Sequence, residues 1–127
     1  MIKRYKYSLL LSLVILYLSL KSADELNNVP FLNIPHFDKI AHLCMYFAFM
    51  SVVILETGKA AVKLRSLMFI AILPFFYGIL MEVLQSTLTL TRYGSLNDVI
   101  FNTLGILLAI LLRKVILYVY SKDSDSN

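Results

Sequence analysis

Several signatures of soluble enzymes are missing from this chain. Its single cysteine, Cys44, allows no intramolecular disulfide and says nothing about the redox compartment. The sequence contains no H-E-x-x-H motif, no G-x-S-x-G motif and no Walker loop. It also lacks the Cys/His spacing that is typical of zinc sites. The sequence therefore gives no support to the metalloprotease, serine hydrolase or P-loop NTPase classes.

Charged residues are also scarce, and this scarcity defines the class of protein. They make up 16% of the chain, whereas 59% of the residues are hydrophobic and the mean hydropathy is +0.76. A chain of 127 residues with this composition is too apolar for an ordinary soluble domain and too short for two domains. The net charge is +4, but no basic patch lies on a soluble face, so we expect no nucleic-acid partner.

Four apolar stretches predict an all-α membrane protein. A spanning helix needs about 20 residues, with about 17 tolerated. The first two stretches are short by this measure, but flanking Tyr, Lys and Arg residues can extend them into the interface. We predict a compact four-helix bundle as a single domain over residues 1–127, with 121–127 as a disordered tail. The stretches are Tyr5–Leu20, Ile40–Leu55, Leu67–Leu88 and Leu96–Leu112, the last continuing to Tyr120.

The first stretch has a second interpretation as a signal peptide. It follows a basic start and contains an apolar run, as such peptides do. The segment after it matches a cleavage site poorly, because Lys21 occupies a position where a small residue is needed. We therefore expect the stretch to be retained as a helix.

The distribution of Lys and Arg predicts the orientation, because short cytoplasmic loops carry an excess of these residues. Of the 12 basic residues, nine fall on one side of a four-helix topology and three on the other. Both termini should therefore be cytoplasmic. The nine are Lys3, Arg4, Lys6, Lys59, Lys63, Arg65, Arg113, Lys114 and Lys122, and the three are Lys21, Lys39 and Arg92.

Polar residues mark the outer ends of three of the four predicted helices. Polar groups near lipid depth are costly, so they usually mark a site. Helical spacing places them on stripes with small neighbours, such as Gly78 and Gly105, which allow close helix approach. We expect these stripes to face one another and form one polar pocket. The residues are Asp38, His42, Tyr46, Glu82, Gln85, Arg92, Asp98 and Asn102.

Each of these residues also has a purely structural interpretation. Ser95-x-x-Asp98 fits a capping box at the start of a helix, and Asp38 can complement the dipole of its helix. Glu82 can pair with Arg92 and only hold the loop. Gln85 and Asn102 can serve as interhelical hydrogen bonds. A mixed metal site of His42, Glu82 and Asp98 is conceivable, but no spacing selects it, so we predict neither a metal nor a cofactor.

The ordered set of polar residues resembles the VanZ-like family of small bacterial membrane proteins. The resemblance covers roughly Pro35 to Ala109, with the motif-bearing part at about 35–112. It implies a multi-helix protein of the bacterial cytoplasmic membrane, from a family named for a member linked to teicoplanin resistance. The residues that carry it are Asp38, Lys39, His42 and Tyr46, then Glu82 and Gln85, then Arg92, Ser95, Asp98, Asn102 and Gly105.

Two classes of function follow from the sequence. In the first, the protein binds or processes an anionic amphiphile of the cell envelope, such as an outer-leaflet lipid or lipid-linked precursor, and the resemblance to the VanZ-like family implies a link to glycopeptide resistance. His42, Glu82, Asp98 and Asp38 would then supply acid–base catalysis, and Arg92, Gln85, Asn102 and Tyr46 would bind the ligand. In the second, the protein is a non-enzymatic membrane factor whose polar cluster fixes helix packing or docks a partner protein.

Overall fold

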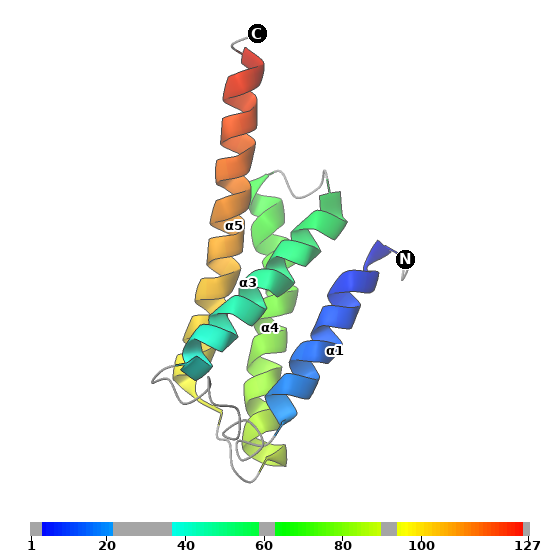
Figure 1. Ribbon diagram of the computed structural model, residues 1–127, viewed down its shortest axis with the longest axis vertical. Helices are drawn as coiled ribbons and strands as arrows, with labels where there is room; N and C mark the ends of the chain where they lie inside the picture. Colours follow the sequence, from blue (N-terminus) through cyan, green and yellow to red (C-terminus); the bar gives the residue numbers. More distant parts are fainter. Residues whose placement is uncertain (1–3, 22–36, 59–62, 90–93, 126–127) are drawn as a thin grey trace.

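The computed structural model describes residues 4–21, 37–58, 63–89 and 94–125, and these residues form helices and no strand (Figure 1). The helices are α1 (Lys6–Leu20), α3 (Phe37–Thr57), α4 (Leu64–Leu88) and α5 (Leu96–Asp125). Each predicted apolar stretch is therefore helical, which confirms the all-α class. Helix α5 continues past Tyr120 into the segment that was expected to be a disordered tail.

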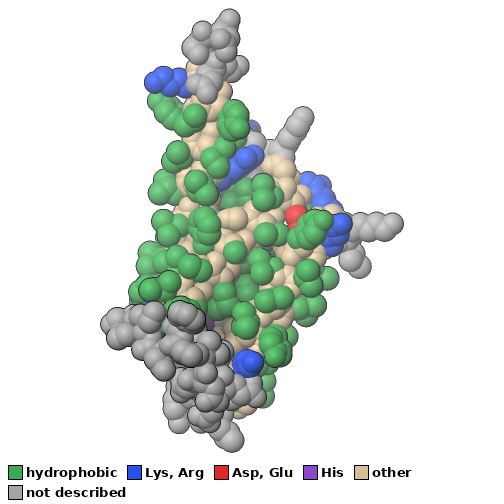
Figure 2. All heavy atoms as spheres, in the orientation of Figure 1, with side chains coloured by type: hydrophobic (Ala, Val, Ile, Leu, Met, Phe, Trp, Pro, Cys, Tyr) green, Lys and Arg blue, Asp and Glu red, His purple; other side chains and the backbone are tan. Residues whose placement is uncertain are grey.

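Helices α3, α4 and α5 are each long and apolar enough to cross a membrane. Helix α1 is apolar but has only 15 residues, or about 22 Å at the usual rise per residue, against about 30 Å of hydrocarbon. Apolar side chains cover the visible sides of the bundle (Figure 2), and large ones such as Phe69 are strongly exposed. In water such a surface would be unfavourable, whereas in lipid it is the expected outer surface of a helical membrane protein.

Helix α3 makes its most extensive contact with α5, and this contact holds the polar residues in place. At Gly105 the backbones of the two helices are in close contact, because a Cβ atom there would overlap Leu43 O and lie 2.8 Å from Phe47 N. Small residues allow such backbone contact in lipid. The core continues along this interface, and its buried members include Tyr46, Phe49, Met50, Ile106, Ala109 and Ile110.

The start of α1 and the end of α3 stabilise each other by reciprocal hydrogen bonds. The carboxylate of Glu56 accepts hydrogen bonds from the backbone N–H groups of Tyr7 (2.8 Å) and Ser8 (3.1 Å), and from the Ser8 hydroxyl. In return, Arg4 donates to the carbonyl oxygens of Glu56 (3.1 Å) and Thr57 (2.8 Å). Two of the unpaired N–H groups of α1 and two of the unpaired carbonyls of α3 are thus satisfied, and an acid lies at a helix N-terminus, where it is favoured.

The start of α3, the end of α4 and the start of α5 lie together, at the end of the bundle away from the two chain termini (Figure 1). We call this region the polar end, because Asp38, Glu82 and Asp98 lie within it. The predicted convergence of three distant helix ends is confirmed by the contacts described below. The membrane face that the polar end occupies stays a prediction from the distribution of Lys and Arg.

A buried polar cluster at the end of the bundle

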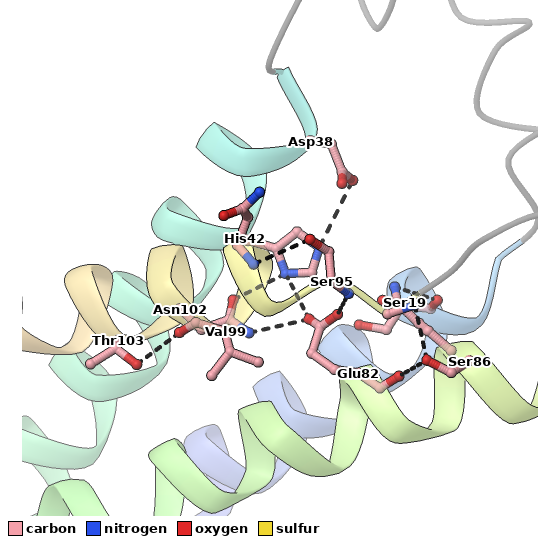
Figure 3. Close-up of polar contacts among 12 residues, drawn as sticks. Ser19, Asp38, His42, Glu82, Ser86, Ser95, Val99, Asn102 and Thr103 are labelled. Carbon is pink, nitrogen blue, oxygen red and sulfur yellow. Dashed lines mark hydrogen bonds and ion pairs between the residues drawn. The ribbon is translucent and has the colours of Figure 1, made fainter.

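His42 is the centre of the polar cluster and is only 2% exposed. It lies one turn after Asp38 on α3, so both side chains project from the same face of the helix. Its Nδ1 atom lies 3.0 Å from Asn102 Oδ1 on α5 and 3.5 Å from Glu82 Oε1 on α4. Its Nε2 atom points the other way, 3.8 Å from Asp38 Oδ1 (Figure 3). One imidazole therefore connects three helices.

Glu82 is a buried acid inside an apolar helix, and the fold gives it hydrogen-bond donors. Its Oε2 atom accepts from the backbone N–H of Ser95 at 3.2 Å, and its Oε1 atom accepts from Asn102 Nδ2 at 3.4 Å. These bonds offset part of the cost of burying the group. The predicted partner Arg92 lies outside the described residues, so a pair between Glu82 and Arg92 stays a prediction.

The start of α5 departs from the capping box expected from Ser95-x-x-Asp98. Ser95 does cap the helix, because its hydroxyl oxygen accepts from Asn97 N at 3.2 Å and its carbonyl accepts from Asp98 N at 2.9 Å. In a full box, however, the acid three residues on accepts from the N–H of the capping residue. Here that N–H donates to Glu82 instead. The buried Asp98 carboxylate lies in the cluster, where one oxygen of Asp98, one of Asp38 and a ring nitrogen of His42 are all within 4.8 Å of one another.

The hydrogen bonds also determine which nitrogen of His42 carries the proton. Asn102 must turn its NH2 group toward Glu82, because that oxygen accepts. Its carbonyl oxygen then faces His42 Nδ1, which must donate the proton of this bond. In the neutral imidazole the lone pair is therefore on Nε2, on the side of Asp38. The ring is thereby prepared to accept a proton or bind a cation at Nε2.

Tyr46 borders the cluster on the core side. Its ring and the Asn102 amide both cover Gly78, where a Cβ atom would lie 3.2 Å from Tyr46 Cε1 and 3.3 Å from Asn102 Nδ2. Tyr46 is 1% exposed, and among the described residues its hydroxyl has no hydrogen-bond partner. A buried hydroxyl of this kind usually has a partner, so the Tyr46 hydroxyl is an unsatisfied polar group beside the cluster.

Gln85 is buried but does not join His42. Its Nε2 atom donates to the Ser19 carbonyl at 2.9 Å and so ties α4 to the end of α1. The predicted role of Gln85 in ligand binding stays a prediction, whereas its described contact is an interhelical hydrogen bond. Ser19 was not identified from the sequence, because a backbone carbonyl at a helix end leaves no signal in the residue type.

The loop into α5 is held by contacts that the sequence did not suggest. Gly94 N donates to the Ser86 hydroxyl oxygen at 3.0 Å, and that hydroxyl donates to Glu82 O at 2.9 Å. A Cβ atom at Gly94 would overlap Glu82 O and lie 2.5 Å from Ser86 Oγ, so only glycine fits. This close approach brings Ser95 within reach of the Glu82 carboxylate.

Comparison with known proteins identifies the family of the chain. No curated protein and no solved structure shows significant similarity to the chain. The family model described as VanZ/LLP1, in contrast, matches residues 3–117, which include all of the cluster residues described above. The chain therefore belongs to the VanZ/LLP1 family.

Proposed function

We propose that the protein binds the anionic headgroup of an amphiphilic envelope component at the polar end and acts on it by acid–base chemistry. The observation that supports this best is the gradient of exposure across the cluster. The side chain of Asp38 is 55% exposed, whereas that of His42, one turn deeper, is 2% exposed. A headgroup can approach from the aqueous side and meet a buried imidazole while its apolar tail stays in lipid.

The chemistry that we propose follows from the proton on Nδ1. His42 Nε2 is the acceptor, so it can take a proton from a water molecule or from a headgroup hydroxyl. Asn102 and Glu82 hold the ring in this tautomer through Nδ1. Asp38 and Asp98 are proposed to orient the reacting group beside Nε2. An anionic headgroup would be repelled by these acids, so we propose that Arg92 contributes a positive charge at the mouth of the site.

We place the protein in the bacterial cytoplasmic membrane, with the polar end at the outer face and both termini inside. The excess of Lys and Arg in the segments at the opposite end supports this orientation. In this arrangement α1 also crosses the membrane, with Arg4 and Lys21 reaching the interfaces at its two ends. Processing of an outer-leaflet component would link the protein to glycopeptide resistance.

The experiment is to identify what copurifies with the full-length protein. Lipids extracted from detergent-purified wild type, His42→Gln and Asn97→Ala would be compared by mass spectrometry with the lipids of the whole membrane. Asn97 is an exposed residue at the start of α5, also at the polar end, so it is the matched control. We expect an anionic lipid to be enriched in the wild type and the control and lost from His42→Gln. If the wild type carries only the bulk lipid composition, the proposal is wrong.

A second candidate is the non-enzymatic packing factor, and the interhelical bonds favour it. The side chain of Asn102 connects α5 to α3 through His42 and to α4 through Glu82. If the cluster serves packing, His42→Gln and Asn102→Ala should lower the amount of protein in the membrane. If it serves chemistry, His42→Gln should lose function at a normal protein level. Quantifying protein beside the lipid measurement separates the two.

A further inference from the structure

We propose that Asp38, His42 and Asp98 form a binding site for a first-row divalent cation, with Zn2+ and Mn2+ as the best-suited ions. The sequence predicted no metal, because these three residues do not form a recognised motif. The cation site itself follows from the positions and the chemistry of its three ligand residues. Its further role, attracting the anionic headgroup, rests on the function proposed above.

The three ligand atoms are close enough together to bind one ion. Each of the three residues offers one ligand atom, and these atoms lie within 4.8 Å of one another. His42 Nε2 and Asp38 Oδ1 are already 3.8 Å apart. Ligand atoms bound to zinc at about 2.1 Å in a tetrahedron are about 3.4 Å apart. Each ligand atom therefore needs to move by less than about 1 Å, which a small side-chain rotation provides.

His42 has the tautomer that a metal ligand needs, and this distinguishes the site from a simple group of acids. A metal-bound histidine almost always donates its other ring N–H to a carbonyl or carboxylate, which fixes the tautomer. Here Nδ1 donates to Asn102 Oδ1, and Glu82 Oε1 lies beyond it at 3.5 Å. The Nε2 lone pair of His42, which is 98% buried, is thus on the side of Asp38, and Asp98 offers an oxygen to the same group of ligand atoms.

The ligand atoms also indicate the choice of ion. One imidazole nitrogen and two carboxylate oxygens are ligands that suit Zn2+ and Mn2+ better than the thiolate-preferring Cu+ or the all-oxygen Ca2+. Three protein ligands leave a coordination position open, as catalytic zinc sites do. A water molecule or an anionic headgroup oxygen can fill it. The exposed Asp38 provides the route by which the ion enters.

The cation would also change the balance of charge in the site. Glu82, Asp38 and Asp98 bring three acids close to one imidazole. A divalent ion at Nε2 would add two positive charges beside these acids and would so favour an anionic oxygen as a further ligand. With the ion bound at Nε2, His42 no longer takes the proton itself, and a water molecule on the ion, whose pKa the ion would lower, supplies the base instead.

The test measures the metal alone on the purified full-length protein without an affinity tag. Protein stripped with a chelator would be titrated with Zn2+ and with Mn2+ by calorimetry, with electron paramagnetic resonance for Mn2+. We expect one ion per chain, bound more tightly as Zn2+ than as Mn2+. Asp98→Asn and Asp38→Asn should each weaken binding by at least 10-fold, and Asp125→Asn, at the far end of α5, should leave it unchanged.

Two results would overturn the site. One is the absence of saturable binding to the wild type, and the other is unchanged affinity in both Asp38→Asn and Asp98→Asn. Because Asp38 is exposed, Asp38→Asn gives a folded test protein even if Asp98→Asn does not fold, and gel filtration shows which has occurred. Repeating the lipid extraction with and without chelator separates the two proposals. Cation binding without lipid enrichment contradicts only the proposed function, whereas enrichment that is equal with and without chelator contradicts the role of the cation.

Discussion

Gly105 is a position where a single methyl group should do severe damage to the polar cluster. Its backbone touches that of α3, so a Cβ atom would overlap Leu43 O and lie 2.8 Å from Phe47 N. Backbone atoms inside a helix cannot give way as a side-chain end can. In Gly105→Ala the two helices must therefore separate by roughly 1 Å to reach ordinary contact distances. Asn102 lies one turn earlier on α5, so its 3.0 Å bond to His42 is lost or lengthened.

The size of the effect can be estimated from two opposing terms. Adding a methyl group to a packed interface costs about 1–3 kcal/mol, and contact with rigid backbone places Gly105→Ala at the upper end. Replacing glycine by alanine inside a helix gains about 1 kcal/mol. We expect a net loss of about 2 kcal/mol, or about 30-fold in the ratio of folded to unfolded protein.

Gly78→Ala is the matched control, because it makes the same change on a neighbouring helix. Its new Cβ atom would meet only side-chain atoms, at 3.2 Å from Tyr46 and 3.3 Å from Asn102, which can shift by a few tenths of an ångström. Thermal unfolding in detergent should show a melting temperature about 5–10 °C lower for Gly105→Ala and nearly unchanged for Gly78→Ala. Equal melting temperatures for the two variants would refute the backbone contact between α3 and α5.

Three further predictions concern the rest of the chain. A topology reporter fused after Lys122 should be cytoplasmic and one inserted at Asn27–Asn28 should be external, and an external C-terminal reporter would contradict the orientation. Arg92→Lys should lose captured anionic lipid at a normal protein level, because lysine lacks the planar two-pronged donor, whereas an unchanged lipid content in Arg92→Ala would remove Arg92 from the site. Glu56→Ala should remove the acceptors that cap α1, and hydrogen exchange in the first turn of α1 should become several-fold faster while α3 is unaffected.

The sequence alone determined the class of the protein and the place of its polar residues. Uninterrupted apolar stretches can bury their backbone polar groups in lipid only as helices, so all four helices were predictable from composition and length. Spacing along each helix placed Asp38 and His42 on one face, because this relation depends only on the helical repeat. The charge distribution likewise predicts that three polar helix ends share one membrane face.

Only the tertiary structure decided which of these residues meet. Glu82, His42 and Asn102 lie far apart in the chain, and their contacts depend on how closely α3 approaches α5 at Gly105. The same packing brings the Gln85 amide to the Ser19 carbonyl, to which it donates a hydrogen bond. It also lets the N–H of Ser95 donate to Glu82, so that no local capping box is completed. A periodic pattern records which face of a helix is polar, but the partner on the opposite helix depends on the rotation and separation of both axes. That is why the tautomer of His42, and with it the cation site, could be derived only once the helices were packed.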